Sequence, residues 1–67
     1  MIFQLNSDYI ELYKLLKLES LVQSGGEAKH IISEGYVSVN GVVETQKRKK
    51  IRKGDVVSFQ EETIEVK

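Results

Sequence analysis

The stretch that decides the fold is Ser24–Val43, which reads SGGEAKHIISEGYVSVNGVV. Its first half predicts a helix, because Ser24 and Glu27 have the S-x-x-E spacing of a capping box. The helix is expected to continue to about Glu34, where Gly35 can end it in the left-handed conformation. Its inward-facing residues are expected to be Ala28, Ile31 and Ile32.

The second half of the stretch predicts a β-hairpin. Residues 37–39 alternate apolar and polar, Asn40-Gly41 is typical of a two-residue type I′ turn, and residues 42–44 form the returning strand. This register pairs Val39 with Val42, so one face of the hairpin is expected to be mostly apolar.

Before this stretch, residues 8–18 have the period of an amphipathic helix that Ser7 or Asp8 can cap. Its apolar face holds the positions i, i+3, i+4 and i+7, namely Tyr9, Leu12, Tyr13 and Leu16. Both tyrosines are therefore expected in the core, whereas Lys14 and Lys17 lie on the flank of the helix.

Short strands are expected near both ends of the chain, at residues 3–5, 56–60 and 63–66, with a turn at Glu61-Glu62. Two short helices cannot enclose a core by themselves and need a sheet to pack against. The sequence thus predicts an α+β domain, in which two short helices pack on a small, strongly bent antiparallel β-sheet.

The composition limits the function. With 67 residues, of which 40% are hydrophobic, the chain is expected to form one domain, residues 1–67, with a thin core. Cysteine is absent, so disulfides and thiolate zinc sites are excluded. No segment is long and apolar enough to span a membrane, and a cytoplasmic location is expected. We expect no metal and no cofactor.

The charge is segregated. Six of the seven residues Lys47–Lys53 are basic although the net charge is zero, which leaves 4 Lys+Arg against 10 Asp+Glu elsewhere. Ile51, in the middle of the run, is expected to enter the core, so that its neighbours project outward. A dense cationic stretch on a neutral domain favours binding to a phosphate backbone.

Several ordered segments carry a family resemblance. They are Leu15-Leu16-Lys17, Leu21-Val22, Ser24–Lys29, Glu34–Gly41 and Gly54–Val57. In this order and spacing they resemble the RNA-binding domain named after ribosomal protein S-four, over about residues 11–59. The Ser-Gly-Gly helix start and the basic loop are most similar to the small stand-alone bacterial members.

The resemblance implies an alpha-L RNA-binding motif that binds structured RNA, such as ribosomal or transfer RNA, with the ribosomal subunit or its assembly factors as partners. The matching positions are Lys14, Lys17, Ser24, Lys29, Lys47, Arg48, Lys49 and Lys50. The residues themselves add four candidates. The backbone amides of Gly25 and Gly26 suit a phosphate, Arg52 belongs to the basic run, and His30 is a surface residue available for hydrogen bonding or stacking.

This chain departs from the family pattern at four positions. Members frequently have Arg where this chain has Glu11, Gly25 and His30, and Asp where it has Tyr13. We therefore expect the helices to contribute less to binding than usual and the basic loop to contribute more.

Parts of the sequence are compatible with three other functions. A protein-interaction module could use the same cations to bind an acidic partner. The sequence does not distinguish a monomer from a dimer. A sulfur-carrier or ubiquitin-like module would need a C-terminal Gly-Gly, whereas this chain ends Ile64–Lys67. An enzyme is least favoured, because one histidine, no cysteine and no carboxylate pair in an apolar pocket leave no acid–base constellation.

Overall fold

The first helix starts later than the sequence predicts. The computed structural model describes all 67 residues, and helix α1 is Leu12–Leu18. Ile10–Glu11 forms strand β2, which pairs antiparallel with β5, Lys50–Ile51, so these residues are extended rather than helical. The predicted start at residue 8 is wrong for this reason. Ser7 does not cap α1; its hydroxyl donates to the Tyr9 carbonyl (2.8 Å).

Helix α2, Gly25–Ser33, begins and ends as predicted. The Glu27 N–H donates to Ser24 Oγ (3.1 Å), and Gly35 follows the helix with a φ of 85°. The second bond of the capping box is displaced by one residue, because Glu27 Oε1 accepts from the Gln23 N–H (2.7 Å) rather than from Ser24. Ala28 and Ile32 are buried, and Ile31 is partly buried.

Five strands form the main sheet, in the order β1-β7-β6-β3-β4. Their bounds are β1 Ile2–Phe3, β3 Val37–Val39, β4 Val42–Val43, β6 Val56–Phe59 and β7 Glu62–Val66. Strand β1 pairs parallel with β7, so the sheet is mixed, and the expected antiparallel pattern fails at this edge. A parallel pair needs a long connection, and the whole domain lies between these two strands.

The turn at Asn40-Gly41 is the one that the sequence predicts, whereas the last turn lies one residue earlier than predicted. Asn40 (φ 52°) and Gly41 (φ 84°) have the positive φ values of a type I′ turn. Phe59 pairs with Glu62, so the last turn is Gln60-Glu61 instead of Glu61-Glu62.

The Asn40 side chain ties the hairpin to the start of β6. Its Oδ1 accepts from the Val56 N–H (2.8 Å), and its Nδ2 donates to Asp55 Oδ1 (2.9 Å). Val39 pairs with Val42 as predicted, yet Val42 is 70% exposed because edge strand β4 extends beyond the rest of the core. The expected apolar face therefore holds only for β3.

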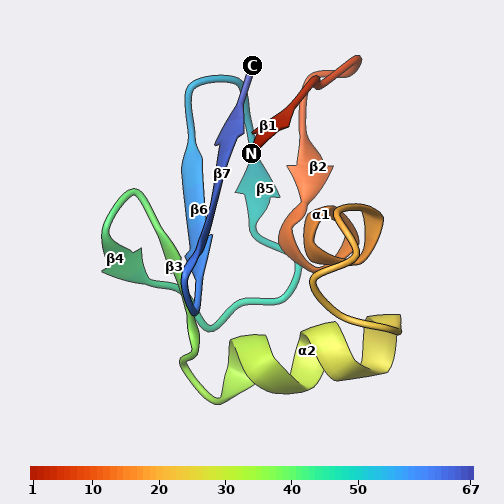
Figure 1. The fold of residues 1–67 in the computed structure, drawn as a ribbon, viewed down its shortest axis with the longest axis vertical. Coiled ribbons are helices and arrows are strands. Elements are labelled where there is room, and N and C mark those ends of the chain that lie inside the picture. The colour runs from red at the N-terminus through yellow and green to blue at the C-terminus, as the bar shows by residue number, and fades with distance from the viewer.

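The core lies between the helices and the main sheet (Figure 1). All 14 buried residues are apolar, among them Leu12, Leu15 and Leu16 of α1. Ile51 is fully buried, which confirms the prediction that it enters the core. Tyr9 is 42% exposed, so the prediction that it lies in the core is wrong, because the helical stripe starts only at Leu12. Tyr13 is partly buried and packs against the core. None of the helices has the length and hydropathy needed to cross a membrane.

Candidate nucleic-acid interface

The four basic residues Lys47–Lys50, which we call the basic loop, are fastened to the start of α1. The Leu12 N–H donates to the Lys49 carbonyl (3.0 Å), and the Tyr13 N–H donates to the Lys47 carbonyl (3.1 Å). These bonds satisfy amides at a helix start that have no partner within the helix. Because the carbonyls face the helix, the loop is held in place by its backbone while all four basic residues remain exposed.

Glu11 joins the loop to the flank of α1. Its Oε1 lies 3.3 Å from Lys14 Nζ, and its Oε2 lies 3.9 Å from Arg48 Nε. Both cationic side chains are more than half exposed, so these ion pairs add little to stability. Their main effect is to keep Lys14 and Arg48 next to each other and to cancel part of the positive charge.

Tyr13 joins the two helices. Its ring centroid lies 4.9 Å from Lys29 Nζ of α2 and 5.9 Å from Lys14 Nζ of α1. Both distances are within the range of cation–π attraction. The ring also packs toward the beginning of α2, since a Cβ added at Gly25 would lie 3.9 Å from it. Lys14 and Lys29 are thereby brought to the same site from different helices.

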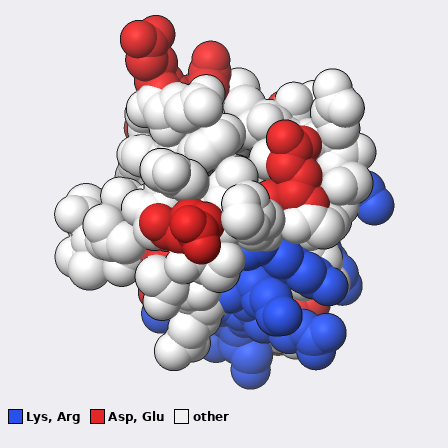
Figure 2. Space-filling model, turned by 90° about the horizontal axis from the view of Figure 1, so that it is seen from below, with Lys and Arg blue, Asp and Glu red and all other residues white.

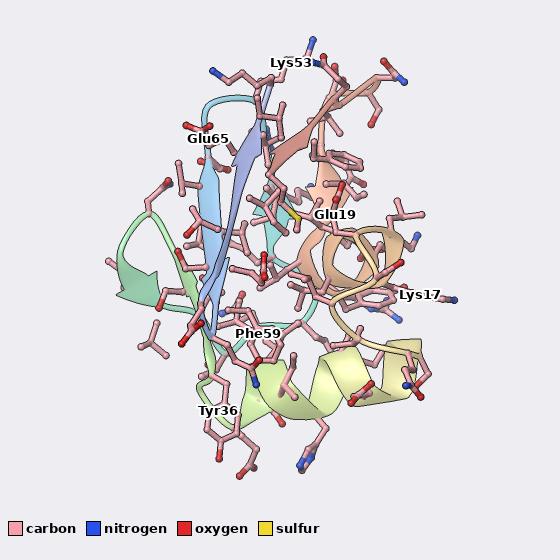
Figure 3. The ribbon with its side chains drawn as sticks, in the orientation of Figure 1. Lys17, Glu19, Tyr36, Lys53, Phe59 and Glu65 are labelled. Carbon is pink, nitrogen blue, oxygen red and sulfur yellow. The ribbon has the colours of Figure 1, made fainter.

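These contacts bring Lys14, Lys29 and Arg48 together, and we call the positive surface around them the basic patch. Its residues are Lys14, Lys17, Lys29 and the basic loop. Lys17 follows Lys14 by three positions, on the same side of α1, and extends outward at the edge of the molecule (Figure 3). Seen from the α2 end, the visible Lys and Arg side chains gather mainly in one area, while most of the Asp and Glu side chains lie outside it (Figure 2).

Other predicted site residues lie outside this cluster of contacts. Arg52 makes no contact with Glu11 or Tyr13, but it lines an open hollow of about 420 Å³ together with Lys49 and Lys50 of the basic loop. Its N–H donates to Asp55 Oδ2 (2.8 Å). Lys53 lies at the opposite end of the molecule from α2 (Figure 3). The basic run is therefore not one strip, because Arg52 stays beside Lys49 and Lys50 whereas Lys53 lies far from α2.

The remaining candidates belong to α2. Ser24 is occupied as the N-cap, Gly25 is half-buried beside Tyr13, and Gly26 is exposed. His30 is exposed one residue after Lys29, and no interaction joins its ring to the basic patch. The structure thus brings Gly25 close to the patch and leaves His30 beside it.

Sequence reasoning missed the residues that organise the patch. Glu11, Tyr13 and Tyr9 hold the cations in place: besides the contacts above, Lys50 Nζ lies 4.9 Å from the centroid of the Tyr9 ring. No motif marks them, because a tyrosine at helical spacing has the same pattern whether it contacts the core or a lysine. The only available signal was Glu11 itself, which stands where the family frequently has Arg.

The model of the S4 domain family matches residues 3–67 of this chain. The chain belongs to the S4 domain family. The resemblance inferred from the sequence motifs is thereby confirmed, and the match extends beyond residues 11–59 to β1 and β7.

Two curated S4-domain relatives are similar over most of their length. The "putative RNA-binding protein YbcJ" of Escherichia coli (strain K12) is 50% identical over 58 residues, which cover 87% of this chain and 83% of YbcJ. The "probable ribosome maturation protein RlbA" of Bacillus subtilis (strain 168) is 38% identical over 56 residues, covering 84% of this chain and 79% of RlbA.

A solved structure shares the S4-domain fold. The solution structure of YbcJ from E. coli is 47% identical in sequence and aligns with a TM-score of 0.75, covering 97% of this chain and 84% of that one. It is described as revealing an alfaL motif involved in RNA binding. The α+β architecture predicted from the sequence is confirmed by this likeness.

Proposed function

We propose that residues 1–67 form a single, non-catalytic RNA-binding domain that docks on structured RNA through the basic patch. The observation that carries this proposal is the convergence of Lys14, Lys29 and Arg48 around Glu11 and Tyr13. These cations come from α1, α2 and the basic loop, and together they form a positive surface on a chain of zero net charge. Such a surface matches a run of phosphates.

The relatives support ribosomal RNA as the class of ligand. YbcJ is named as RNA-binding and RlbA as a ribosome maturation protein, and both align with most of this chain. A cytoplasmic location and work on a ribosomal subunit or its assembly factors follow from this proposal. Contacts from Lys and Arg to phosphates fix position rather than read bases, so the patch would recognise mainly the shape of the RNA.

Salt dependence tests the proposal directly. Neutralising four phosphates predicts that log K falls with log salt with a slope of about −3.6, so raising KCl from about 50 to about 200 mM lowers affinity about a hundredfold. Fluorescence anisotropy with a short blunt RNA duplex measures this slope. Polyglutamate serves as the competitor that represents an acidic protein.

The outcomes distinguish RNA from an acidic protein as the ligand of the basic patch. If the RNA duplex displaces polyglutamate when both are present at the same concentration of negative charges, and if log K falls steeply with log salt, the RNA-binding function is supported. Binding of polyglutamate that the duplex does not displace, or duplex affinity that does not change with salt, contradicts it.

Replacing Glu11 by glutamine is expected to strengthen RNA binding. The carboxylate lies beside Lys14 and Arg48 and cancels part of their charge, and an exposed ion pair of this kind amounts to at most about 1 kcal/mol. The Glu11→Gln variant should therefore bind the blunt RNA duplex about two- to fivefold more tightly, as measured by anisotropy at low salt.

Glu65→Gln is the matched control for this change. Glu65 is exposed on β7 and lies on the other side of the molecule from Lys17 (Figure 3). The control makes the same change in net charge away from the basic patch and should alter affinity less than Glu11→Gln. Equal effects of the two variants would show that net charge, rather than the patch, governs binding.

A further inference from the structure

A hollow beside the basic patch contains an exposed aromatic ring. Its open volume is about 430 Å³, and it is lined by Ser7, Asp8, Tyr9, Ile10, Glu11 and Lys14. Strand β2 begins at its edge, and the pairing of Glu11 with Lys50 in β2–β5 places the hollow next to the basic loop. Lys14 belongs both to the hollow and to the basic patch.

Tyr9 is the feature that the proposed function leaves unexplained. Its side chain is 42% exposed, although it adjoins the hollow and the basic loop. Its backbone is held in place, because its carbonyl accepts the Ser7 hydroxyl (2.8 Å) and the next residue enters β2. Lys50 Nζ lies 4.9 Å from the ring centroid, so the ring is paired with a cation of the basic loop.

We infer that this hollow receives one unpaired RNA base, which takes the place of Lys50 Nζ on the Tyr9 ring, so that Lys50 and Lys14 hold the phosphates on either side of it. Unpaired bases are commonly bound by stacking on an aromatic side chain next to a positive groove. The carboxylate of Asp8 supplies hydrogen-bond acceptors on the wall, which suit a base that carries an amino group, such as guanine. This inference rests on the proposed function and adds a preference for RNA with an extruded base.

The experiment compares three RNA duplexes that differ at one position. The first is blunt and fully paired, the second has a single bulged guanine, and the third has an abasic bulge at the same place. Fluorescence anisotropy at about 50 mM KCl gives the affinity of each for the native protein. The native protein should bind the bulged-guanine duplex about tenfold more tightly than the abasic duplex, since the contribution of one stacked base is of that order.

Variants of Tyr9 test whether the ring causes the difference. Tyr9→Leu should remove the tenfold preference, and Tyr9→Phe should keep it, because stacking requires only the ring. Tyr36→Leu is the matched control: Tyr36 is 63% exposed but lies at the far end of α2, away from β2 (Figures 1 and 3). This control should keep the preference. Thermal unfolding followed by circular dichroism verifies that each variant is folded.

The results distinguish this inference from the proposed function. If the native protein binds the blunt duplex with steep salt dependence but does not prefer the bulged guanine, the base-binding hollow is wrong and the proposed function stands. If Tyr9→Leu retains the preference, the hollow is likewise wrong. Failure to bind all three duplexes would overturn the proposed function and this inference with it.

Discussion

Replacing all four residues of the basic loop by glutamine is expected to lower affinity for an RNA duplex by about three orders of magnitude. Each cation at the surface of the RNA contributes a separate share of the counterion release that drives binding. All four side chains are exposed, and only Arg48 has an ion-pair partner, Glu11. Their removal takes away more than half of the seven cations of the basic patch.

The same replacement should leave the fold intact. The loop is fixed through the carbonyls of Lys47 and Lys49, which accept from the first amides of α1, and glutamine has the same backbone. Circular dichroism and the midpoint of urea unfolding should therefore be close to those of the native protein. Loss of RNA binding by an unfolded variant would say nothing about the basic loop, so the unfolding measurement accompanies the binding assay.

A control variant excludes a simple effect of net charge. Lys53→Gln combined with Lys67→Gln removes two cations from the end of the molecule opposite α2, where Lys53 and the C-terminus lie (Figures 1 and 3). We expect this double variant to lose no more than a few-fold in affinity. If the four-residue variant retained native affinity, the basic loop would have no part in binding.

The second large effect is expected at Ile51. Its side chain is fully buried, and it sits between the basic loop and Arg52. Truncation of a buried isoleucine to alanine costs about 2–5 kcal/mol. A domain of this length has a total stability of about 3–10 kcal/mol, so Ile51→Ala should remove much of it.

Urea unfolding followed by circular dichroism measures this loss. The Ile51→Val variant is the matched control, because it removes one methylene and should cost only about 1 kcal/mol. RNA binds only the folded form, so added RNA duplex should raise the unfolding midpoint of Ile51→Ala. A midpoint for Ile51→Ala within error of the native value would show that Ile51 is not an anchor of the basic loop.

Local sequence signals were sufficient where the conformation of a few neighbouring residues determines the structure. The Ser24 cap, the end of α2 at Gly35 and the Asn40-Gly41 turn each depend on the conformation of a few neighbouring residues. The burial of Ile51 was also predictable, since one apolar residue among six cations has no other favourable place.

The errors in the fold arose where distant segments decide the structure. Ile10–Glu11 has a helical pattern with the residues that follow, but pairing with Lys50–Ile51 makes it a strand. The parallel pairing of β1 with β7 brings together the two ends of the chain, which no local pattern records. Val42 was expected on an apolar face because the register alone does not show where the core ends.

For the candidate site, the sequence identified the cations but not their arrangement. Lys14, Lys29 and Arg48 were named, and the structure brings them together through Glu11 and Tyr13. Arg52 is also a predicted site residue, and it lines one hollow with Lys49 and Lys50, whereas Lys53 of the same run lies at the opposite end of the molecule from α2. A run of charges in sequence does not show on which side of a strand each charge lies, since successive side chains alternate.

The most direct test of the basic patch is an NMR titration of the ¹⁵N-labelled protein with a short RNA duplex. At 67 residues, every backbone amide can be followed separately. The patch predicts that the largest chemical-shift changes occur at the start of α1, near Lys29 of α2 and in the basic loop, while β7 and the Gln60-Glu61 turn stay unchanged. Changes concentrated on β4, β7 or that turn, with the basic loop unaffected, would contradict the account.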